Sequence, residues 1–321
     1  RYEYKIDSTA KTIDVRFIEG TSTNTTAGYT LHPAFSTDIE NGGWSSDIAG
    51  FWMAKYPAGW QNGQGTSLGS VDMSNIAYQT SASVNTYAGT ITNGTTKMSY
   101  PEFKANTYAY NNISVGDAYT LSQDIKNASR YGLRNIDSHL EKNSEWGAVA
   151  YLAHSKYGMN GAEVTVNDAD KGNNPTTIYA VTSQESVTNT STTQNITGVY
   201  DMSGCVWERT ATFLKGSSET RYIAGMIDNS STAASSKYVT IYEGTWDTCN
   251  KIGDAVKETS TNGNATSGSW NEDYSEFVIS SGPVFGRGGN CGNGRNAGIF
   301  AFDDQYGASG NFVGFRAVLV P

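Results

Sequence analysis

The sequence predicts an α+β domain in which a twisted antiparallel sheet carries helices on one side and long polar loops join the strands. Three observations lead to this fold class. Charged residues make up only 17% of the chain and hydrophobic ones 37%, while Gly, Ser, Thr and Asn fill much of the rest, as in proteins with many short strands. Aromatic residues reach 12%, which indicates a packed core. Two segments have helical periodicity, whereas the other apolar runs are short.

The first nineteen residues have the period-two pattern of a β-hairpin. Apolar side chains alternate with polar ones on both sides of a polar turn at residues 7–11, at Tyr2, Tyr4, Ile6, Ile13, Val15 and Phe17. Residues 20–28, rich in Thr and Asn, have the composition of a linker. We therefore assign residues 1–28 to an N-terminal hairpin and linker, or to the end of a preceding module. The main domain then spans residues 29–321.

Residues 48–56 form an apolar run that predicts a buried strand, and the polar stretch 59–96 predicts long loops or short edge strands. Farther along, residues 177–181, 238–242 and 277–279 are short apolar runs between polar segments. No repeat of fixed period is visible.

Two helices are predicted in the middle of the chain. The first spans residues 115–131, with Ser114 as its N-cap and Gly132 as its stop. The second spans residues 145–157, with Ser144 as its cap and Gly158 after its last turn.

The net charge of −9 has no basic cluster, so nucleic acid is not an expected partner. No stretch has the roughly eighteen apolar residues of a membrane span, so we expect no direct membrane insertion by this chain. Because the sequence opens on Arg1 rather than Met, we expect that an upstream segment was cleaved or left out.

Familiar catalytic patterns are missing from the sequence. The histidines, His32, His139 and His154, have no metal-binding spacing, and the glycine-rich run 286–294 lacks the Lys-Ser/Thr of a phosphate-binding loop. The cysteines, Cys205, Cys249 and Cys291, lack the paired spacings of a zinc site. They leave two alternatives open: one disulfide with one free thiol, or three unpaired thiols.

Three motifs in order resemble the formylglycine-generating-enzyme (sulfatase-modifying factor) superfamily, which has a C-type-lectin-like fold. They are KNSEWGAVAYL at residues 142–152, VYDMSGCVWERT at 199–210, and RGG at 287–289 followed by GFRA at 314–317. The resemblance covers roughly residues 29–321, which is nearly the whole chain. It implies that Trp146 and Trp207 anchor the core, and that Arg287 and Arg316 form structural polar networks.

Departures from the family argue against its enzymatic activity. The resemblance implies that an oxidase would use two cysteines near the C-terminus to bind copper, but only Cys291 lies there. Iron-dependent relatives use histidines, and none follows His154. We therefore expect no enzyme and no required cofactor, and we expect Cys205 and Cys249 to lie far from Cys291.

The resemblance also implies a calcium site in the loop around the second motif. Matching the motif residue by residue gives Asp201 and Glu208 as carboxylate ligands and the carbonyl groups of Gly204 and Val206 as the other two. The alternative is that Asp201 caps a turn while Glu208 pairs with an arginine.

The segment of about residues 287–316 resembles the variable region of proteins diversified by retroelements, in which adenine-directed mutation alters Asn codons on a constant scaffold. The expected ligand-binding positions are Cys291, Asn293, Arg295, Asn296, Ile299, Asp303, Asp304, Tyr306, Ser309, Asn311 and Phe312. Their side chains should form one exposed patch, because a core does not tolerate random exchange. Phe300, Phe302, Val313 and Phe315 should face inward, Gln305 should belong to the scaffold, and Trp270 should border the patch.

The expected function is attachment. Tyr, Arg, Asn, Asp and Ser on a rigid fold are typical of antibody binding sites. Residues 31–35, 50–55 and 202–204 are similar to segments of phage tail and bacterial surface proteins with this fold. We thus expect an extracellular protein, on a virion tail or a bacterial cell surface, that binds a protein or glycan ligand on a cell. The alternatives are an architectural tail or pilus protein without diversification and, less favoured, an active enzyme.

Overall fold

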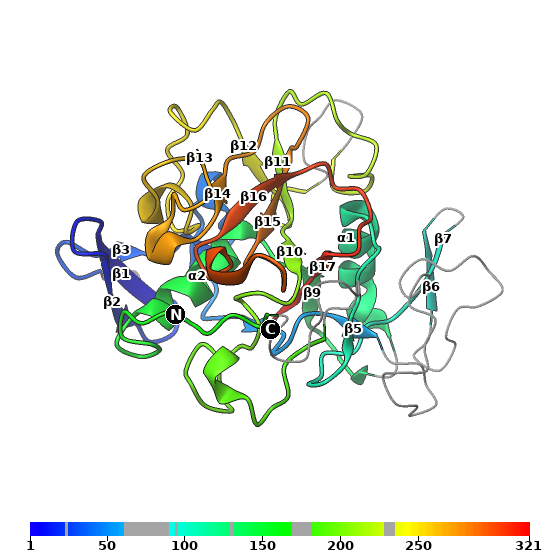
Figure 1. Ribbon diagram of the computed structural model, residues 1–321, viewed down its shortest axis with the longest axis horizontal. Coiled ribbons are helices and arrows are strands. Elements are labelled where there is room, and N and C mark those ends of the chain that lie inside the picture. The colour runs from blue at the N-terminus through cyan, green and yellow to red at the C-terminus, as the bar shows by residue number, and fades with distance from the viewer. Residues whose placement is uncertain (23–24, 61–89, 94–95, 129–130, 169–180, 228–234) are drawn as a thin grey trace.

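The computed structural model describes residues 1–22, 25–60, 90–93, 96–128, 131–168, 181–227 and 235–321. Within these ranges the protein has a mixed α/β architecture with two α-helices, short 3₁₀ turns and several small sheets (Figure 1). The mixed composition agrees with the predicted α+β class. Most strands have only two to four residues, and long loops connect them.

The predicted N-terminal hairpin is confirmed. Its strands pair antiparallel from Tyr2 with Phe17 to Asp7 with Thr12, and a third strand joins them in the order β2-β1-β3: β1 (Tyr2–Asp7), β2 (Thr12–Phe17) and β3 (Thr30–Leu31). Its apolar face belongs to the same core cluster as helix α2 (Asn143–His154). The Tyr2 hydroxyl donates to the carbonyl oxygen of Ala148 at 2.6 Å. The hairpin is therefore packed against the rest of the protein.

The largest sheet has six short strands in the order β13-β14-β16-β15-β10-β17. It is mixed rather than purely antiparallel, because β10 runs parallel to β17 and β14 runs parallel to β16. Its strands are β10 (Trp207–Arg209), β13 (Asn264–Ala265), β14 (Ser275–Glu276), β15 (Val284–Arg287), β16 (Phe302–Gln305) and β17 (Val313–Phe315). The strand that carries the second motif, β10, thus lies between two strands from the C-terminal segment.

The predicted buried strand at residues 48–56 is wrong in extent and burial. Only Trp52–Met53 (β4) forms a strand, at the edge of a sheet with the order β4-β18-β9, and Trp52 is 60% exposed. The other strands of this sheet are β9 (Asp137–Leu140) and β18 (Ala317–Val320). The remaining pairs are β5 (Gly59–Trp60) with β8 (Tyr108–Ala109), β6 (Thr90–Asn93) with β7 (Thr96–Ser99), and β11 (Thr212–Leu214) with β12 (Thr240–Tyr242).

Helix α1 (Val115–Asp124) begins where predicted and ends earlier. The Ser114 hydroxyl accepts from the backbone N–H of Asp117 at 3.2 Å, as an N-cap does. After Asp124 the chain continues as a single 3₁₀ turn, and the Lys126 N–H donates to Ser138 Oγ of β9 at 3.0 Å. The Ser138 side chain of the neighbouring strand thus accepts a hydrogen bond from a backbone N–H that would donate to a carbonyl group of the helix if α1 continued.

Helix α2 (Asn143–His154) begins two residues before the predicted start. Glu145 accepts the backbone N–H of Lys142 at 2.8 Å, so the N-cap is Lys142. Ser144, the predicted cap, instead donates to the carbonyl oxygen of Gly42 at 2.8 Å. A tertiary contact therefore overrides the local capping signal.

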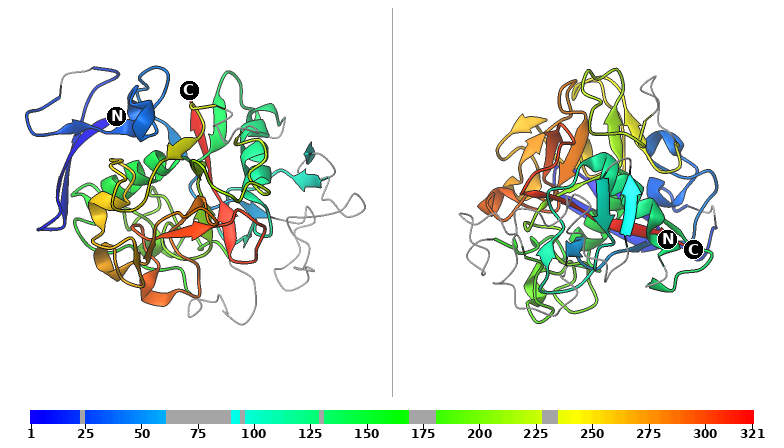
Figure 2. Two further views of the ribbon diagram at one scale, coloured as in Figure 1. Left: turned by 90° about the horizontal axis from the view of Figure 1, so that it is seen from above. Right: turned by 90° about the vertical axis from the view of Figure 1, so that its right-hand side faces the viewer.

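Two expected segments lie largely outside the described residues, namely most of 59–96 and of 177–181. Of the other short runs, 238–242 contains β12, whereas 277–279 follows β14 without forming a strand. Figure 2 shows both termini on the same side of the protein, in agreement with Figure 1. Figure 1 also shows the hairpin and α1 on opposite sides of the central strands.

Candidate functional site

A fully buried ion pair joins Arg316, the residue after β17, to Glu208 of β10 in the largest sheet. Arg316 donates from Nε and Nη2 to the two carboxylate oxygens of Glu208 at 2.8 and 2.7 Å, and both side chains have no exposed surface. Arg316 also donates to the carbonyl oxygens of Ala54 and Tyr200. The arginine therefore joins β10, the loop after β4 and the start of the second motif at Tyr200.

Arg287 forms the second buried network that the resemblance implies. Its guanidinium donates to Asn143 Oδ1 and to the carbonyl oxygens of Asp254 and Ala255, at 2.9 to 3.1 Å. Its Cζ atom also lies 5.5 Å from the centroid of the Trp146 ring. The first motif, which contains Trp146, and the third, which contains Arg287, therefore meet in the core.

The C-terminal segment separates a buried side from an exposed one. Phe300, Phe302 and Phe315 have no exposed surface, as predicted, whereas Val313 is half-buried rather than buried. Gln305 is buried and accepts from Arg209 Nε at 3.0 Å, in keeping with a scaffold position.

The exposed side carries most of the predicted ligand-binding residues. Tyr306 is 60% exposed and Phe312 37%, and Arg295 and Ser309 are exposed as well. Other predicted residues are partly exposed, and we call the exposed and partly exposed set the C-terminal face: Asn293, Arg295, Asn296, Asp303, Asp304, Tyr306, Ser309, Asn311 and Phe312.

Two predicted residues do not belong to the C-terminal face. Cys291 is only 3% exposed and lies in an apolar cluster, and Ile299 has no exposed surface and packs with Phe300. The carbonyl oxygen of Ile299 accepts from Trp146 Nε1 at 2.8 Å. The prediction that both side chains point outward is wrong, because codon chemistry says nothing about which side of the chain a residue occupies.

Two aromatic residues connect the two ends of the C-terminal face. The backbone N–H of Trp207 donates to the Phe312 carbonyl at 2.8 Å, and the Trp207 ring lies 6.1 Å from the Tyr274 ring. The Tyr274 N–H in turn donates to the Asn296 carbonyl at 2.9 Å. The sequence did not single out Tyr274, since no motif marks it.

Trp270, which was expected to border the patch, is a core residue. It is 2% exposed, and its ring packs against those of His154 and Phe300 at 5.3 and 5.4 Å. Tyr274 occupies the bordering position instead.

Three carboxylates gather at one point of the C-terminal face. Oxygen atoms of Glu276, Asp303 and Asp304 all lie within 4.8 Å of one another, and all three side chains are partly exposed. Burial, with the neighbouring carboxylates, raises the pKa of Asp303 to about 7 and the pKa of Asp304 to about 6. The cluster is therefore only partly charged near neutral pH.

A groove of about 510 Å³ adjoins this acidic cluster. Glu276 lines it together with aromatic and aliphatic residues, including Trp246, Phe277 and Ile279. The Trp246 ring stacks on Phe302, with centroids 6.2 Å apart and planes at 18°. The groove thus rests directly on the scaffold of the C-terminal face.

The two predicted carboxylate ligands of calcium already have protein partners. Asp201 accepts from the Asn167 side-chain amide at 3.0 Å and from the backbone N–H of Ser183 at 2.8 Å, while Arg316 uses both oxygens of Glu208. The other two predicted ligands are carbonyl groups of Gly204 and Val206, and both residues are buried. These contacts match the alternative in which Glu208 pairs with an arginine. Among the described residues, the group of acidic side chains close enough to hold a cation is Glu276 with Asp303 and Asp304.

The expected separation of the cysteines is wrong for one pair. Cys205 and Cys291 belong to one buried cluster, and the Cys291 N–H donates to the Cys205 carbonyl at 3.1 Å. Cys249 lies in a different cluster, with Tyr242 and Phe277. All three are free buried thiols, and burial raises the pKa of each.

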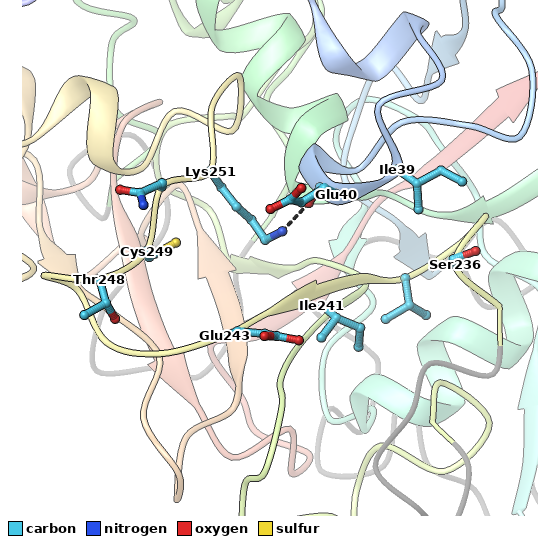
Figure 3. Close-up of a pocket in the computed structure, with 10 residues that line it drawn as sticks. Ile39, Glu40, Ser236, Ile241, Glu243, Thr248, Cys249 and Lys251 are labelled. Atoms are coloured by element: carbon cyan, nitrogen blue, oxygen red, sulfur yellow. Dashed lines mark hydrogen bonds between the residues drawn. The ribbon is translucent and has the colours of Figure 1, made fainter.

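A separate pocket of about 400 Å³ lies between the 3₁₀ turn Ile39–Asn41 and β12. Figure 3 shows the Lys251 ammonium group donating to the Glu40 carbonyl across it, with Glu243 on the opposite wall. Its lining residues do not include members of the C-terminal face.

Comparisons with known proteins give no identification. No protein-family model matches the chain, and no curated protein matches its sequence. In the part of the chain that the structure describes, no helix has the length and apolar character needed to cross a bilayer.

Proposed function

We propose that this chain is a non-enzymatic, extracellular binding protein with a C-type-lectin-like fold, whose C-terminal face attaches to a protein or glycan ligand on a cell surface. The observation that carries the proposal is the division of one segment into two sides. Phe300, Phe302 and Phe315 are fully buried. Tyr306 and Phe312, which lie between Phe302 and Phe315 in the sequence, are exposed. Such an arrangement lets outward side chains change without disturbing the core.

The chemistry of the C-terminal face supports ligand binding. Exposed Tyr306 and Phe312 offer large apolar surfaces at a small entropic cost, and Arg295 adds a polar contact. The groove beside Glu276 offers a concave site for a ligand side chain. We propose that a retroelement diversifies these exposed positions and that the protein is displayed on a phage tail or a bacterial surface.

The state of the cysteines supports a binding function over an oxidase. A reactive cysteine needs an accessible thiolate, but Cys205 and Cys291 are buried and burial raises the pKa of both.

The test compares two double variants in adhesion to intact bacterial cells, measured as the fraction of fluorescently labelled chain that the cells retain. Tyr306→Ala with Phe312→Ala should abolish retention, because it removes both aromatic anchors. The melting temperature should stay within about a degree or two, because exposed substitutions cost under roughly 0.5 kcal/mol.

The matched control is Phe17→Ala with Trp52→Ala, which removes two aromatic residues that are each 60% exposed and lie outside the C-terminal face. This variant should be retained as well as the unchanged protein. Equal retention of the Tyr306/Phe312 variant would place the binding site elsewhere.

A further inference from the structure

We infer that Cys205 and Cys291 are the two ends of a disulfide site that locks the C-terminal segment onto the loop before β10, while Cys249 stays a free thiol. The sequence leaves open whether the chain has one disulfide or three unpaired thiols. The fold identifies the pair, because it brings together two cysteines that are distant along the chain and keeps the third apart.

Two backbone hydrogen bonds align the loops that carry the pair. The Gly204 N–H donates to the Gly288 carbonyl at 3.0 Å, and the Cys291 N–H donates to the Cys205 carbonyl at 3.1 Å. The direct bond between Cys291 and Cys205 places the two residues next to each other, as a disulfide requires, since it bridges Cα atoms about 4.4–6.8 Å apart.

The surroundings of the pair suit a cross-link. Cys205 and Cys291 form a small buried cluster with Ala109 and Val206, so a sulfur–sulfur bond would sit among apolar atoms. Cys205 is also held firmly, because its N–H donates to the Asn167 carbonyl at 2.9 Å.

The bond forms by exchange with a disulfide oxidant such as oxidised glutathione. The two thiols lose two protons and two electrons as the Sγ–Sγ bond forms, and the glutathione disulfide breaks to give two glutathione thiols. Because burial raises the pKa of both thiols, exchange is fast only while the chain is folding and they are still accessible.

The cross-link would stiffen the base of the C-terminal segment. Cys291 lies between the buried strand β15 and two residues of the next loop, the partly exposed Asn293 and the exposed Arg295, so the bond would fix the point where that loop leaves the sheet. Closing a long loop also restricts the unfolded chain, which raises stability.

The experiment refolds the unfolded, reduced chain with and without oxidised glutathione. Thiols are then titrated under denaturing conditions, and the proteolytic peptides are mapped by mass spectrometry. The oxidised protein should show one thiol in place of three and a peptide that joins Cys205 to Cys291. Its melting temperature should exceed that of the reduced protein by about 5–10 °C.

The controls separate the pair from the third cysteine. Cys249→Ala should form the same cross-link and leave no thiol, whereas Cys205→Ala and Cys291→Ala should each retain two thiols after the same treatment. Three thiols in the oxidised protein, or a cross-linked peptide that contains Cys249, would overturn the assignment. The peptide map of the unchanged protein decides the matter even if a variant fails to fold.

Discussion

The buried and exposed sides of the C-terminal segment differ in how each side chain is held. On the inside, Arg316 makes four hydrogen bonds with Glu208 and two carbonyl groups, and none of its surface reaches solvent. On the outside, the exposed Arg295 pairs with Glu272 at 3.2 Å, where the two side chains are 80% and 62% exposed. Two arginines of one segment thus have opposite surroundings: Arg316 is buried in a hydrogen-bonded network, and Arg295 forms an exposed ion pair.

This difference predicts the largest effect for Arg316→Met. The change leaves the Glu208 carboxylate buried without its partner, which should lower the free energy of unfolding by about 3–5 kcal/mol. Chemical denaturation at neutral pH measures the change. Arg295→Met is the matched control and should cost less than about 1 kcal/mol, because its ion pair is exposed. Similar losses in the two variants would remove the distinction between the two sides.

A second prediction concerns Glu141, a fully buried carboxyl group next to this network. Neither of its oxygens has a hydrogen-bond partner among the residues that the structure describes, and burial raises its pKa well above the usual value. The folded state therefore keeps the proton at a pH where the unfolded chain has lost it, so the contribution of Glu141 to stability is full below about pH 4.5 and is lost as pH rises.

Glu141→Gln removes this dependence. The variant should gain stability relative to the unchanged protein between pH 4 and pH 8, by about 1.4 kcal/mol for each pKa unit that separates the folded and unfolded states. Denaturation curves at several pH values measure the gain. A difference that stays constant over this range would mean that Glu141 does not hold a proton in the folded protein.

The smallest predicted effect lies on the C-terminal face, where Asp303 and Asp304 have pKa values raised to about 7 and about 6. Their contribution to stability is present below about pH 4 and is lost as pH rises toward 7. Asp303→Asn with Asp304→Asn should flatten the fall in melting temperature over that range. Solvent screening of these half-exposed groups limits the effect to about 1 kcal/mol. An unchanged pH profile would show that the two carboxyl groups titrate alike in the folded and unfolded chain.

The sequence predicts which local elements form better than it predicts where each one begins and ends. Alternation in the first nineteen residues identifies β1 and β2, and Ser114 marks the start of α1. The end of α1 and the start of α2 depend instead on Ser138 and Gly42, which are distant in the sequence. The buried strand predicted near Trp52 fails because an apolar run does not indicate which sheet, or which edge, it will join.

The residues of the candidate site could likewise be predicted only in part. The motifs identify Arg287 and Arg316, and the resemblance to a variable region predicts that the scaffold residues Phe300 and Phe302 are buried. They do not distinguish buried Ile299 from exposed members of the predicted set such as Tyr306. The link through Tyr274 and the proximity of Cys205 to Cys291 arise from chain crossings that leave no pattern in the sequence.

The most direct test of the account randomises four exposed positions and, in a second library, four buried ones. The exposed set is Arg295, Tyr306, Ser309 and Phe312, and the buried set is Ile299, Phe300, Phe302 and Phe315. The measurement is the fraction of displayed variants that resist a protease. Exposed substitutions usually cost under about 0.5 kcal/mol and buried ones about 2–5 kcal/mol. Most of the first library should therefore remain folded and most of the second should not, whereas equal losses in the two libraries would contradict an exchangeable face on a fixed scaffold.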